Sequence, residues 1–339
     1  MSAILAAIQR VVRGDHLTRQ QAVDAMRDIM DGNATPAQIA CLLTALRMKG
    51  ETAEEIGGFA SVMREKATPI RCSAPVVIDT CGTGGDASGT FNISTAAAFV
   101  AAGAGCTVAK HGNRAITGKT GGADVLAVLG VNIDAPPEVV ERCIEEARVG
   151  FLFAPRLHSA MKHALPARRE IGIRTVFNIL GPLTNPAGAR HQVLGVFNPN
   201  LGDVVAEVLG TLGSVHSFVV SGLDGLDEIS TTGTTHVAEL VDGSVRTCDV
   251  EPADFGMPAA ALADLRVESP EESAWIIRDI LTGQTGPCRD IVVLNAAAAI
   301  ASADPHGRIA ECIPTAVESI DSGMARQALE KLIEVSNRT

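Results

Sequence analysis

A glycine-rich loop is the first feature of the sequence that could do chemistry. It comprises Gly82-Thr83-Gly84-Gly85-Asp86 and follows residues 75–80, PVVIDT, an apolar and β-branched run that predicts a buried strand. Glycines in this position let the backbone approach a ligand closely and turn N–H groups toward it. Asn92, Ser94 and Thr95 then open a predicted helix, whose free N–H groups attract anions. The pattern predicts a pyrophosphate cradle, although a tight turn followed by an ordinary helix cap would produce it too.

A basic loop follows the next predicted strand. Lys110-His111-Gly112-Asn113-Arg114 carries two permanent cations, a third group that can become one, and an amide. Lysine binds phosphate as a compact charge, so this loop predicts a second set of phosphate contacts. A solvated surface loop is the competing interpretation. In the glycine-rich loop at residues 82–86, the spacing of the glycines matches neither a dinucleotide fingerprint nor a P-loop.

An acidic pair, Asp227-Glu228, follows the predicted strand at residues 216–222. Two neighbouring carboxylates beside a pyrophosphate cradle suit Mg²⁺, which prefers oxygen ligands and shares them with substrate phosphates. A solvated acidic turn would look the same, so the pair alone decides nothing.

Basic residues are concentrated between positions 154 and 186. An arginine in this segment could hold a carboxylate through two parallel hydrogen bonds. On the residues alone, a basic amphipathic surface helix explains the segment slightly better. The basic side chains are His158, Lys162, His163, Arg168, Arg169 and Arg174.

The elements that must position these residues form two predicted domains. Residues 1–72 have helical periodicity, with capping patterns at Thr18 and Thr52 and a helix start at Thr35-Pro36, and predict a small all-helical domain. From residue 73 to 339, strands alternate with helices, which predicts an α/β domain with a mainly parallel central sheet and helices on both faces. Residues 235–250 predict an antiparallel hairpin turning at Asp242-Gly243.

Composition excludes several classes of function. The net charge of −11 argues against nucleic-acid binding, and with no Tyr and a single Trp a base-stacking surface is hard to build. No apolar run is long enough to cross a membrane, and the N-terminus lacks the pattern of a signal peptide. The eight cysteines form no CxxC pair, which favours reduced thiols in a cytoplasmic protein.

Five motifs in fixed order resemble the anthranilate phosphoribosyltransferases, and the resemblance extends over nearly the whole chain. The KHGN and KTGGADVL region is also similar to the wider class of nucleoside phosphorylases. The motifs are IDTCGTGGD, FNIST, KHGNRAITGKTGGADVLAVLG, RTVFNILGPLTNP and GLDGLDEIS.

The resemblance implies a fold in which the helical domain also receives the segment near 160–185, with the active site in a cleft between the two domains. It also implies a homodimer through the helical domain. The implied reaction joins anthranilate to the ribose C1 of phosphoribosyl pyrophosphate, with two Mg²⁺ ions per subunit. The rival interpretations are a pyrimidine nucleoside phosphorylase, which would need no acidic pair, and a non-catalytic paralogue.

The resemblance also assigns residues. The ions are expected on Ser94, Asp227 and Glu228. Thr117-Gly118 stands where many members have Ser-Ser, so only the backbone of Gly118 could bind. The anthranilate positions are Gly82, His111, Asn113, Arg168 and Pro182. The phosphoribosyl pyrophosphate positions are Gly82, Gly85, Asp86, Thr90, Asn92, Ile93, Ser94, Thr95, Lys110, His111, Gly112, Asn113, Arg114, Ala115, Ile116, Thr117, Gly118 and Gly122.

Overall fold

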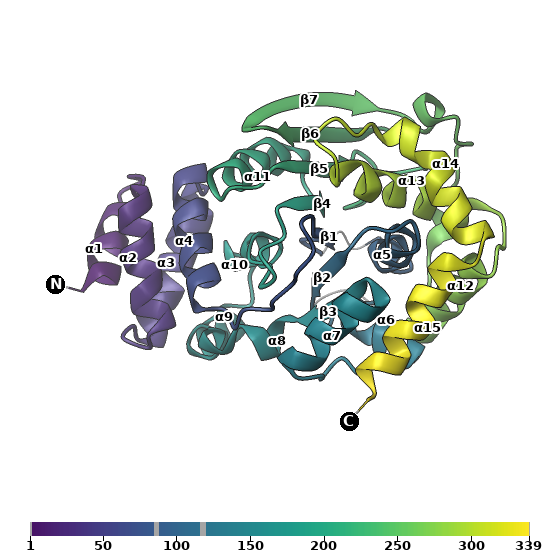
Figure 1. The fold of residues 1–339 in the computed structure, drawn as a ribbon. Helices are drawn as coiled ribbons and strands as arrows, with labels where there is room; N and C mark the ends of the chain where they lie inside the picture. Colours follow the sequence, from purple (N-terminus) through teal and green to yellow (C-terminus); the bar gives the residue numbers. More distant parts are fainter. Residues whose placement is uncertain (1, 85–87, 116–119, 339) are drawn as a thin grey trace.

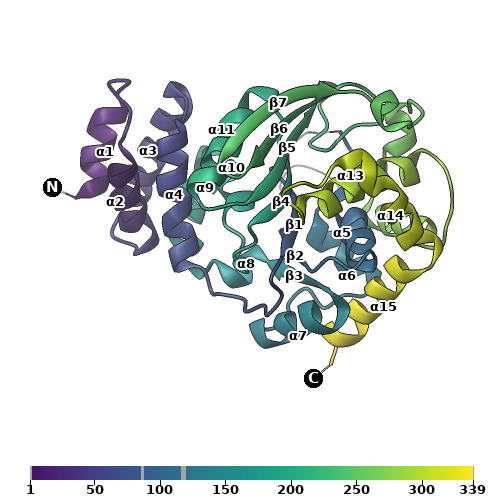
Figure 2. The ribbon, with the colours of Figure 1, turned by 45° about the horizontal axis from the view of Figure 1, so that its top comes forward.

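The structure is a computed structural model that describes residues 2–84, 88–115 and 120–338. Four helices form the N-terminal part and stand to one side of a seven-stranded sheet (Figures 1 and 2). They are α1 (Ala3–Val11), α2 (Arg19–Met30), α3 (Pro36–Lys49) and α4 (Ala53–Lys66). In the described part of the chain, no helix is long and apolar enough to cross a membrane.

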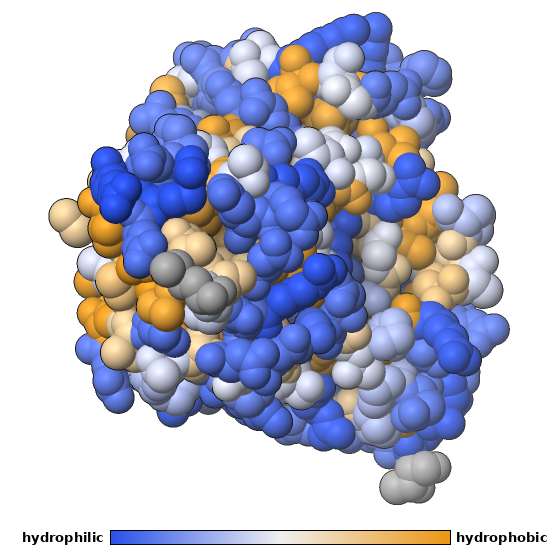
Figure 3. All heavy atoms as spheres, turned by 90° about the vertical axis from the view of Figure 1, so that its left-hand side faces the viewer, coloured by the Kyte–Doolittle hydropathy of each residue, from blue (hydrophilic) through white to orange (hydrophobic). Residues whose placement is uncertain are grey.

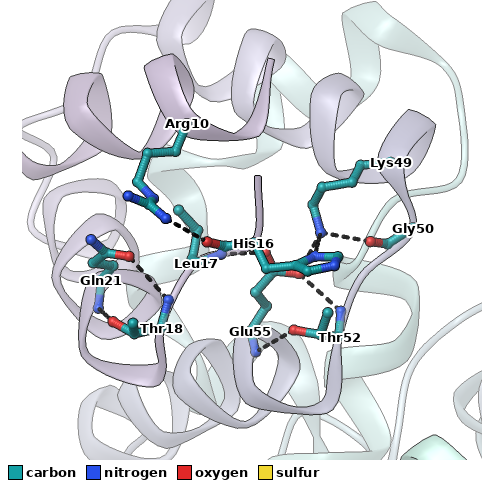
Figure 4. Close-up of polar contacts among 9 residues, drawn as sticks. All are labelled: Arg10, His16, Leu17, Thr18, Gln21, Lys49, Gly50, Thr52 and Glu55. Carbon is teal, nitrogen blue, oxygen red and sulfur yellow. Dashed lines mark hydrogen bonds and ion pairs between the residues drawn. The ribbon is translucent and has the colours of Figure 1, made fainter. Parts of the chain in front are cut away.

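Capping boxes begin three of these helices, and the sequence predicts those at Thr18 and Thr52. The hydroxyl of Thr18, Thr35 or Thr52 accepts a hydrogen bond from the backbone N–H three residues later, and the side chain at that later position binds back. Each box satisfies donors that a helix start otherwise leaves unpaired. The box of α4 is also part of a larger network at the corner between helices (Figure 4).

The sheet has the strand order β3-β2-β1-β4-β5-β6-β7. Its first five members are parallel, and the last two form the predicted hairpin. Asp242 and Gly243 both have positive φ at the hairpin turn, as a two-residue turn of this kind requires. The strands are β1 (Ile78–Gly82), β2 (Val108–Gly112), β3 (Val149–Phe153), β4 (His191–Gly195), β5 (His216–Gly222), β6 (Thr235–Val241) and β7 (Ser244–Val250).

Helices cover both faces of the sheet, which confirms the predicted fold class. Adjacent residues of β5 show the two layers, because Phe218 and Val220 pack into one hydrophobic core and Val219 into the other. Figure 1 shows α5 and α13 on one face and α11 on the other. The helices are α5 (Ile93–Gly103), α6 (Gly122–Leu129), α7 (Pro137–Ala147), α8 (Ala154–Leu157), α9 (Leu165–Ile171), α10 (Phe177–Leu180), α11 (Pro199–Thr211), α12 (Pro270–Leu281), α13 (Pro287–Ser302), α14 (Ile309–Asp321) and α15 (Met324–Ser336), with short 3₁₀ turns at Ser159–His163, Gly181–Leu183, Pro252–Phe255 and Leu262–Leu265.

The segment that follows β3 packs against the N-terminal helices. Helix α9 contacts α3, and the turn Ser159–His163 contacts α2. Ala164 and Ala167 share a hydrophobic core with Ile39 and Leu43 of α3. The division into domains at residues 72 and 73 stays a prediction.

Candidate active site

The sheet topology marks one place where a ligand is expected. From β1 the chain adds β2 and β3 on one side, and only then crosses to β4 and β5 on the other. Open α/β sheets bind ligands beyond the carboxyl ends of their strands where this direction reverses. Here the reversal lies between Gly82 and Gly195, which end β1 and β4 and pair with each other in register.

Asp227 lies directly against both of these glycines. A β-carbon on Gly82 would stand 2.4 Å from Asp227 Oδ2, and one on Gly195 would stand 1.6 Å from the Asp227 carbonyl oxygen. Any side chain at either strand end would therefore displace the aspartate. The two glycines are what allow a carboxylate from the loop after β5 to lie at the switch point.

Backbone N–H groups from two other segments hold the acidic pair. Asp227 Oδ2 accepts a hydrogen bond from Gly84 N–H at 3.0 Å. Glu228 Oε1 accepts one from Ser94 N–H, in the first turn of α5, at 3.1 Å. The predicted acidic pair, glycine loop and helix start are thus in direct contact.

Asn295 fixes the backbone next to the acidic pair. This buried side chain of α13 accepts a hydrogen bond from Ile229 N–H and donates one to the Ile229 carbonyl, both at 2.9 Å. The two bonds set the orientation of the peptide that follows Glu228. Asn295 has no recognisable signal in the sequence, because it lies in an alanine-rich helix far along the chain.

The donor set at the acidic pair fits magnesium. Asp227, Glu228 and Ser94 supply two carboxylates and a hydroxyl, all of them oxygen ligands. Among the residues that the structure describes, no three His, Cys, Asp or Glu side chains gather as a closed metal site would require. Magnesium is usually held by one or two carboxylates together with water and substrate phosphates. The residues therefore fit Mg²⁺ shared with a phosphorylated ligand.

Lys110 is buried below this cluster. Its Nζ donates to the carbonyl of Thr80 at 2.5 Å and to Ser94 Oγ at 3.1 Å. Burial lowers the pKa of Lys110, and the nearby carboxylate of Asp79 acts in the opposite direction. The lysine thus brings positive charge close to the acidic pair and orients the Ser94 hydroxyl.

Asp79 connects the strands from within. It is fully buried, and its carboxylate accepts hydrogen bonds from His111 N–H at 3.1 Å and from Asn185 Nδ2 at 2.8 Å. Asn185 also donates to the Ala109 carbonyl at 2.7 Å. Burial raises the pKa of Asp79, whereas the hydrogen bond from Asn185 lowers it. Asp79 was not among the predicted site residues, although a polar residue within PVVIDT was a usable signal.

His111 forms a buried pair with His158. His111 Nδ1 lies 3.1 Å from the carbonyl oxygen of Gly181, and its Nε2 lies 3.2 Å from His158 Nε2. Because a carbonyl only accepts, His111 carries its proton on Nδ1 and accepts from His158 through Nε2. Burial lowers the pKa of His111 to about 3 and that of His158 to about 4, so both rings are neutral near pH 7. Gly181 precedes Pro182, which brings these two predicted residues together.

The end of the basic loop contacts the first turn of α6. Asn113 Oδ1 accepts a hydrogen bond from Arg114 N–H at 2.7 Å. The Arg114 guanidinium pairs with Asp124 at 2.7 Å, and the same carboxylate accepts from Ala115 N–H at 2.9 Å. Asp124, in the first turn of α6, therefore fixes Arg114 and Ala115 beside the start of that helix at Gly122.

The predicted residues around the start of α5 are tied to the segment at residue 120. Asn92 caps the helix by accepting from Thr95 N–H, and its amide donates to the Thr120 carbonyl, both at 3.1 Å. Thr120 Oγ1 in turn donates to the Thr90 carbonyl at 2.9 Å. Ile93 and Thr95 are buried within this helix start.

Arg168 lies on α9, in the segment that packs against the N-terminal helices. Its guanidinium is 4.9 Å from the centroid of the Phe177 ring, and burial lowers its pKa. Within the described part of the chain, no carboxylate lies within ion-pair distance of Arg168. Five of the predicted residues fall outside the described ranges and stay predictions. They are Gly85, Asp86, Ile116, Thr117 and Gly118.

Two family models match the chain. The helical bundle domain of the glycosyl transferase family matches residues 5–67, and the a/b domain of the glycosyl transferase family matches residues 74–326. Together these matches define the class of protein as a glycosyl transferase built from a helical bundle and an α/β domain.

Individual relatives identify the family within this class. The anthranilate phosphoribosyltransferase of Symbiobacterium thermophilum is 54% identical over 98% of both chains, and that of Moorella thermoacetica is 52% identical over 97% of both. The solved structure of the Thermus thermophilus enzyme matches with a TM-score of 0.92 at 42% identity, covering 98% of this chain and 99% of that one. The Saccharomyces cerevisiae enzyme in complex with phosphoribosyl pyrophosphate and Mg matches with a TM-score of 0.88 at 31% identity, covering 98% and 97%. The chain belongs to the anthranilate phosphoribosyltransferase family.

Proposed function

We propose that this protein transfers the phosphoribosyl group of phosphoribosyl pyrophosphate to the amine of anthranilate, a step of tryptophan biosynthesis. The products are N-(5-phosphoribosyl)anthranilate and pyrophosphate. The observation that carries the proposal is the meeting of Asp227, Glu228 and Ser94 with two glycine strand ends at the switch point of the sheet. An acidic pair in this position suits a magnesium-bound pyrophosphate and has no purpose in a phosphorylase that uses free phosphate.

Molecules bound in structures of relatives support the proposed substrates. One Saccharomyces cerevisiae structure contains phosphoribosyl pyrophosphate and Mg, and another contains 4-fluoroanthranilate. In this chain we assign two Mg²⁺ ions to Ser94, Asp227 and Glu228. When bound, Mg²⁺ neutralises charge on the pyrophosphate as it departs.

The residues of this chain would act mainly by positioning. The bond from ribose C1 to the pyrophosphate oxygen breaks and a bond from C1 to nitrogen forms, so negative charge accumulates on the leaving group. The N–H groups of Gly84 and Ser94 hold Asp227 and Glu228 in place, so these carboxylates could keep Mg²⁺ beside that charge, which is an electrostatic contribution. Arg168 would hold the anthranilate carboxylate, and Asn113 the ring.

No strong base is required, because the aromatic amine of anthranilate is largely neutral at pH 7. The hydrogen bonds of His111 are consistent with a reaction that uses no strong base. One ring nitrogen donates to Gly181 and the other accepts from His158, so both are already engaged. We therefore assign His111 and Pro182 to the wall of the anthranilate site.

We also propose a cytoplasmic homodimer that associates through the N-terminal helices. Leu5 on α1, Val12 directly after it and Met48 on α3 are exposed, with Met48 at 84%. Figure 3 shows apolar patches between hydrophilic residues on this side of the molecule. Light scattering of the purified protein tests this, and a monomer would contradict it.

The reaction is tested by mixing the protein with anthranilate, phosphoribosyl pyrophosphate and Mg²⁺ and following anthranilate fluorescence. We expect a loss of fluorescence that requires all three components. If folded protein leaves the fluorescence unchanged, the proposal is wrong. Phosphorolysis of thymidine or uridine would then indicate a nucleoside phosphorylase, and retention on heparin would indicate a nucleic-acid-binding paralogue.

A further inference from the structure

One arginine reaches the glycine loop from the segment that packs against the N-terminal helices. Arg174 Nη2 donates a hydrogen bond to the Gly84 carbonyl at 2.9 Å. Its guanidinium also lies 4.1 Å from the centroid of the Phe197 ring. Arg174 follows α9, Gly84 follows β1 and Phe197 follows β4, so a single side chain joins three segments at the carboxyl edge of the sheet.

The arginine acts on a residue that already touches the acidic pair. Gly84 donates through its N–H to Asp227 Oδ2 at 3.0 Å and accepts through its carbonyl from Arg174. Its φ of +62° is in the left-handed region, where glycine carries no β-carbon penalty. Gly84 is thus held from both sides, by a carboxylate and by a guanidinium.

The chemistry of this contact requires arginine. The planar guanidinium can stack on an aromatic ring while an N–H at its edge donates to a carbonyl. A lysine ammonium can make one contact or the other, because it is a compact charge on a flexible stem. Within the ranges that the structure describes, no carboxylate forms an ion pair with Arg174.

We propose that Arg174 is a positioning residue for phosphoribosyl pyrophosphate. It acts through Gly84, keeping this residue and the Asp227 carboxylate in the arrangement that receives the magnesium-bound pyrophosphate. The inference rests on the proposed function and extends it to a residue of the helical side of the molecule.

Calorimetric titration of phosphoribosyl pyrophosphate with Mg²⁺, without anthranilate, tests this directly. For Arg174→Ala we expect affinity to fall roughly tenfold, the loss typical of one hydrogen bond to a charged group. Arg174→Lys should recover only part of it, and the anthranilate KM at saturating phosphoribosyl pyrophosphate should not change. Arg169→Ala is the matched control, since this exposed arginine lies five residues earlier.

A double-mutant cycle separates positioning from general damage. If Phe197 supports the arginine, Phe197→Leu should weaken binding too, and the combined variant should be no worse than Arg174→Ala alone. Additive effects, unchanged affinity in Arg174→Ala, or equal losses of affinity for both substrates would overturn the inference. The proposed function is tested separately, by the turnover of the wild type. The inference about Arg174 depends only on how much the affinity for phosphoribosyl pyrophosphate differs between variant and wild type.

Discussion

The Nε2 atoms of His111 and His158 face each other at 3.2 Å in the interior of the molecule. The two side chains come from β2 and from the turn after α8, and both residues are less than a tenth exposed. The Gly181 carbonyl binds the other nitrogen of His111, so a single proton occupies the gap between the rings. Protonation of either ring would set two N–H groups against each other or place a charge in a buried site.

Acid should therefore destabilise the protein through this pair. The folded-state pKa values of about 3 and about 4 are lower than that of a histidine in an unfolded chain, about 6.5. The unfolded state consequently binds protons first, and the stabilisation present above pH 6.5 is lost as the pH falls toward 4. Each histidine contributes a slope of about 1.4 kcal/mol per pH unit in this window.

Urea unfolding at pH 7 and pH 5 measures the effect. In His158→Gln, the loss of unfolding free energy between the two values should be smaller than in the wild type by about 2 kcal/mol. The same substitution at exposed His306 is the control. A variant that loses as much stability as the wild type would show that His158 is not the acid-sensitive group.

Local patterns in the sequence predicted the elements because the physical causes are themselves local. Threonine followed three residues later by Gln or Glu marked the starts of α2 and α4, Thr35-Pro36 marked the start of α3, and Asp242-Gly243 marked the hairpin turn. The glycine loop and the acidic pair were recognisable for the same reason. Each combines residues of one kind directly after a strand.

Long-range contacts could not be predicted in this way. Asp79 and Asn185 are separated by 106 residues, and neither reveals the other along the chain. Arg174 belongs to a run of basic residues in which no pattern distinguishes it from Arg169. Its role depends on the Gly84 carbonyl, which only the folded chain brings within reach.

Glu55 should be the most sensitive charged position of the N-terminal helices. It is fully buried and accepts hydrogen bonds from Leu17 N–H at 2.8 Å, and from Thr52 N–H and Lys49 Nζ, both at 2.9 Å (Figure 4). Glu55→Ala would leave the Leu17 and Thr52 N–H groups without this acceptor. It would also remove the only carboxylate that pairs with the buried Lys49 side chain among the described residues, which would keep only His16 Nδ1 and the Gly50 carbonyl. We expect a loss of about 3–5 kcal/mol of unfolding free energy.

Chemical denaturation of Glu55→Ala and Glu54→Ala checks this. Glu54 is exposed in the same helical turn, so its removal changes the net charge equally without breaking the network. The control should lose less than about 1 kcal/mol. Similar losses in both variants would mean that the helix end, and not the buried network, accounts for the effect.

Asp227 and Glu228 should determine the response to magnesium. Asp227→Asn and Glu228→Gln each remove one of the two negative charges that would attract the ion. Half-saturation by Mg²⁺ should therefore rise by at least about tenfold, the cost typical of losing even an outer partner of a metal site. Turnover measured across a magnesium titration checks this. Asp242→Asn removes a carboxylate at the exposed hairpin turn and is the control; equal responses would remove the acidic pair from the metal site.

Arg168 should control affinity for anthranilate. Its guanidinium is partly desolvated over Phe177, and no carboxylate of the described chain forms an ion pair with it. Its paired N–H donors could therefore bind the carboxylate of a ligand. Arg168→Ala should raise the anthranilate KM roughly ten- to a hundredfold, from the loss of charge-assisted hydrogen bonds. The KM for phosphoribosyl pyrophosphate should change little, and an unchanged anthranilate KM would refute the assignment.

Aniline provides a further check, because it keeps the reacting amine and lacks the carboxylate. If Arg168 recognises the carboxylate, the preference of the wild type for anthranilate over aniline, expressed as a ratio of kcat/KM, should largely disappear in Arg168→Ala. Arg168→Lys should retain part of the preference, since lysine keeps the charge but not the paired donors. A preference that survives in Arg168→Ala would show that another group binds the carboxylate, and Asn113 would be the next residue to test.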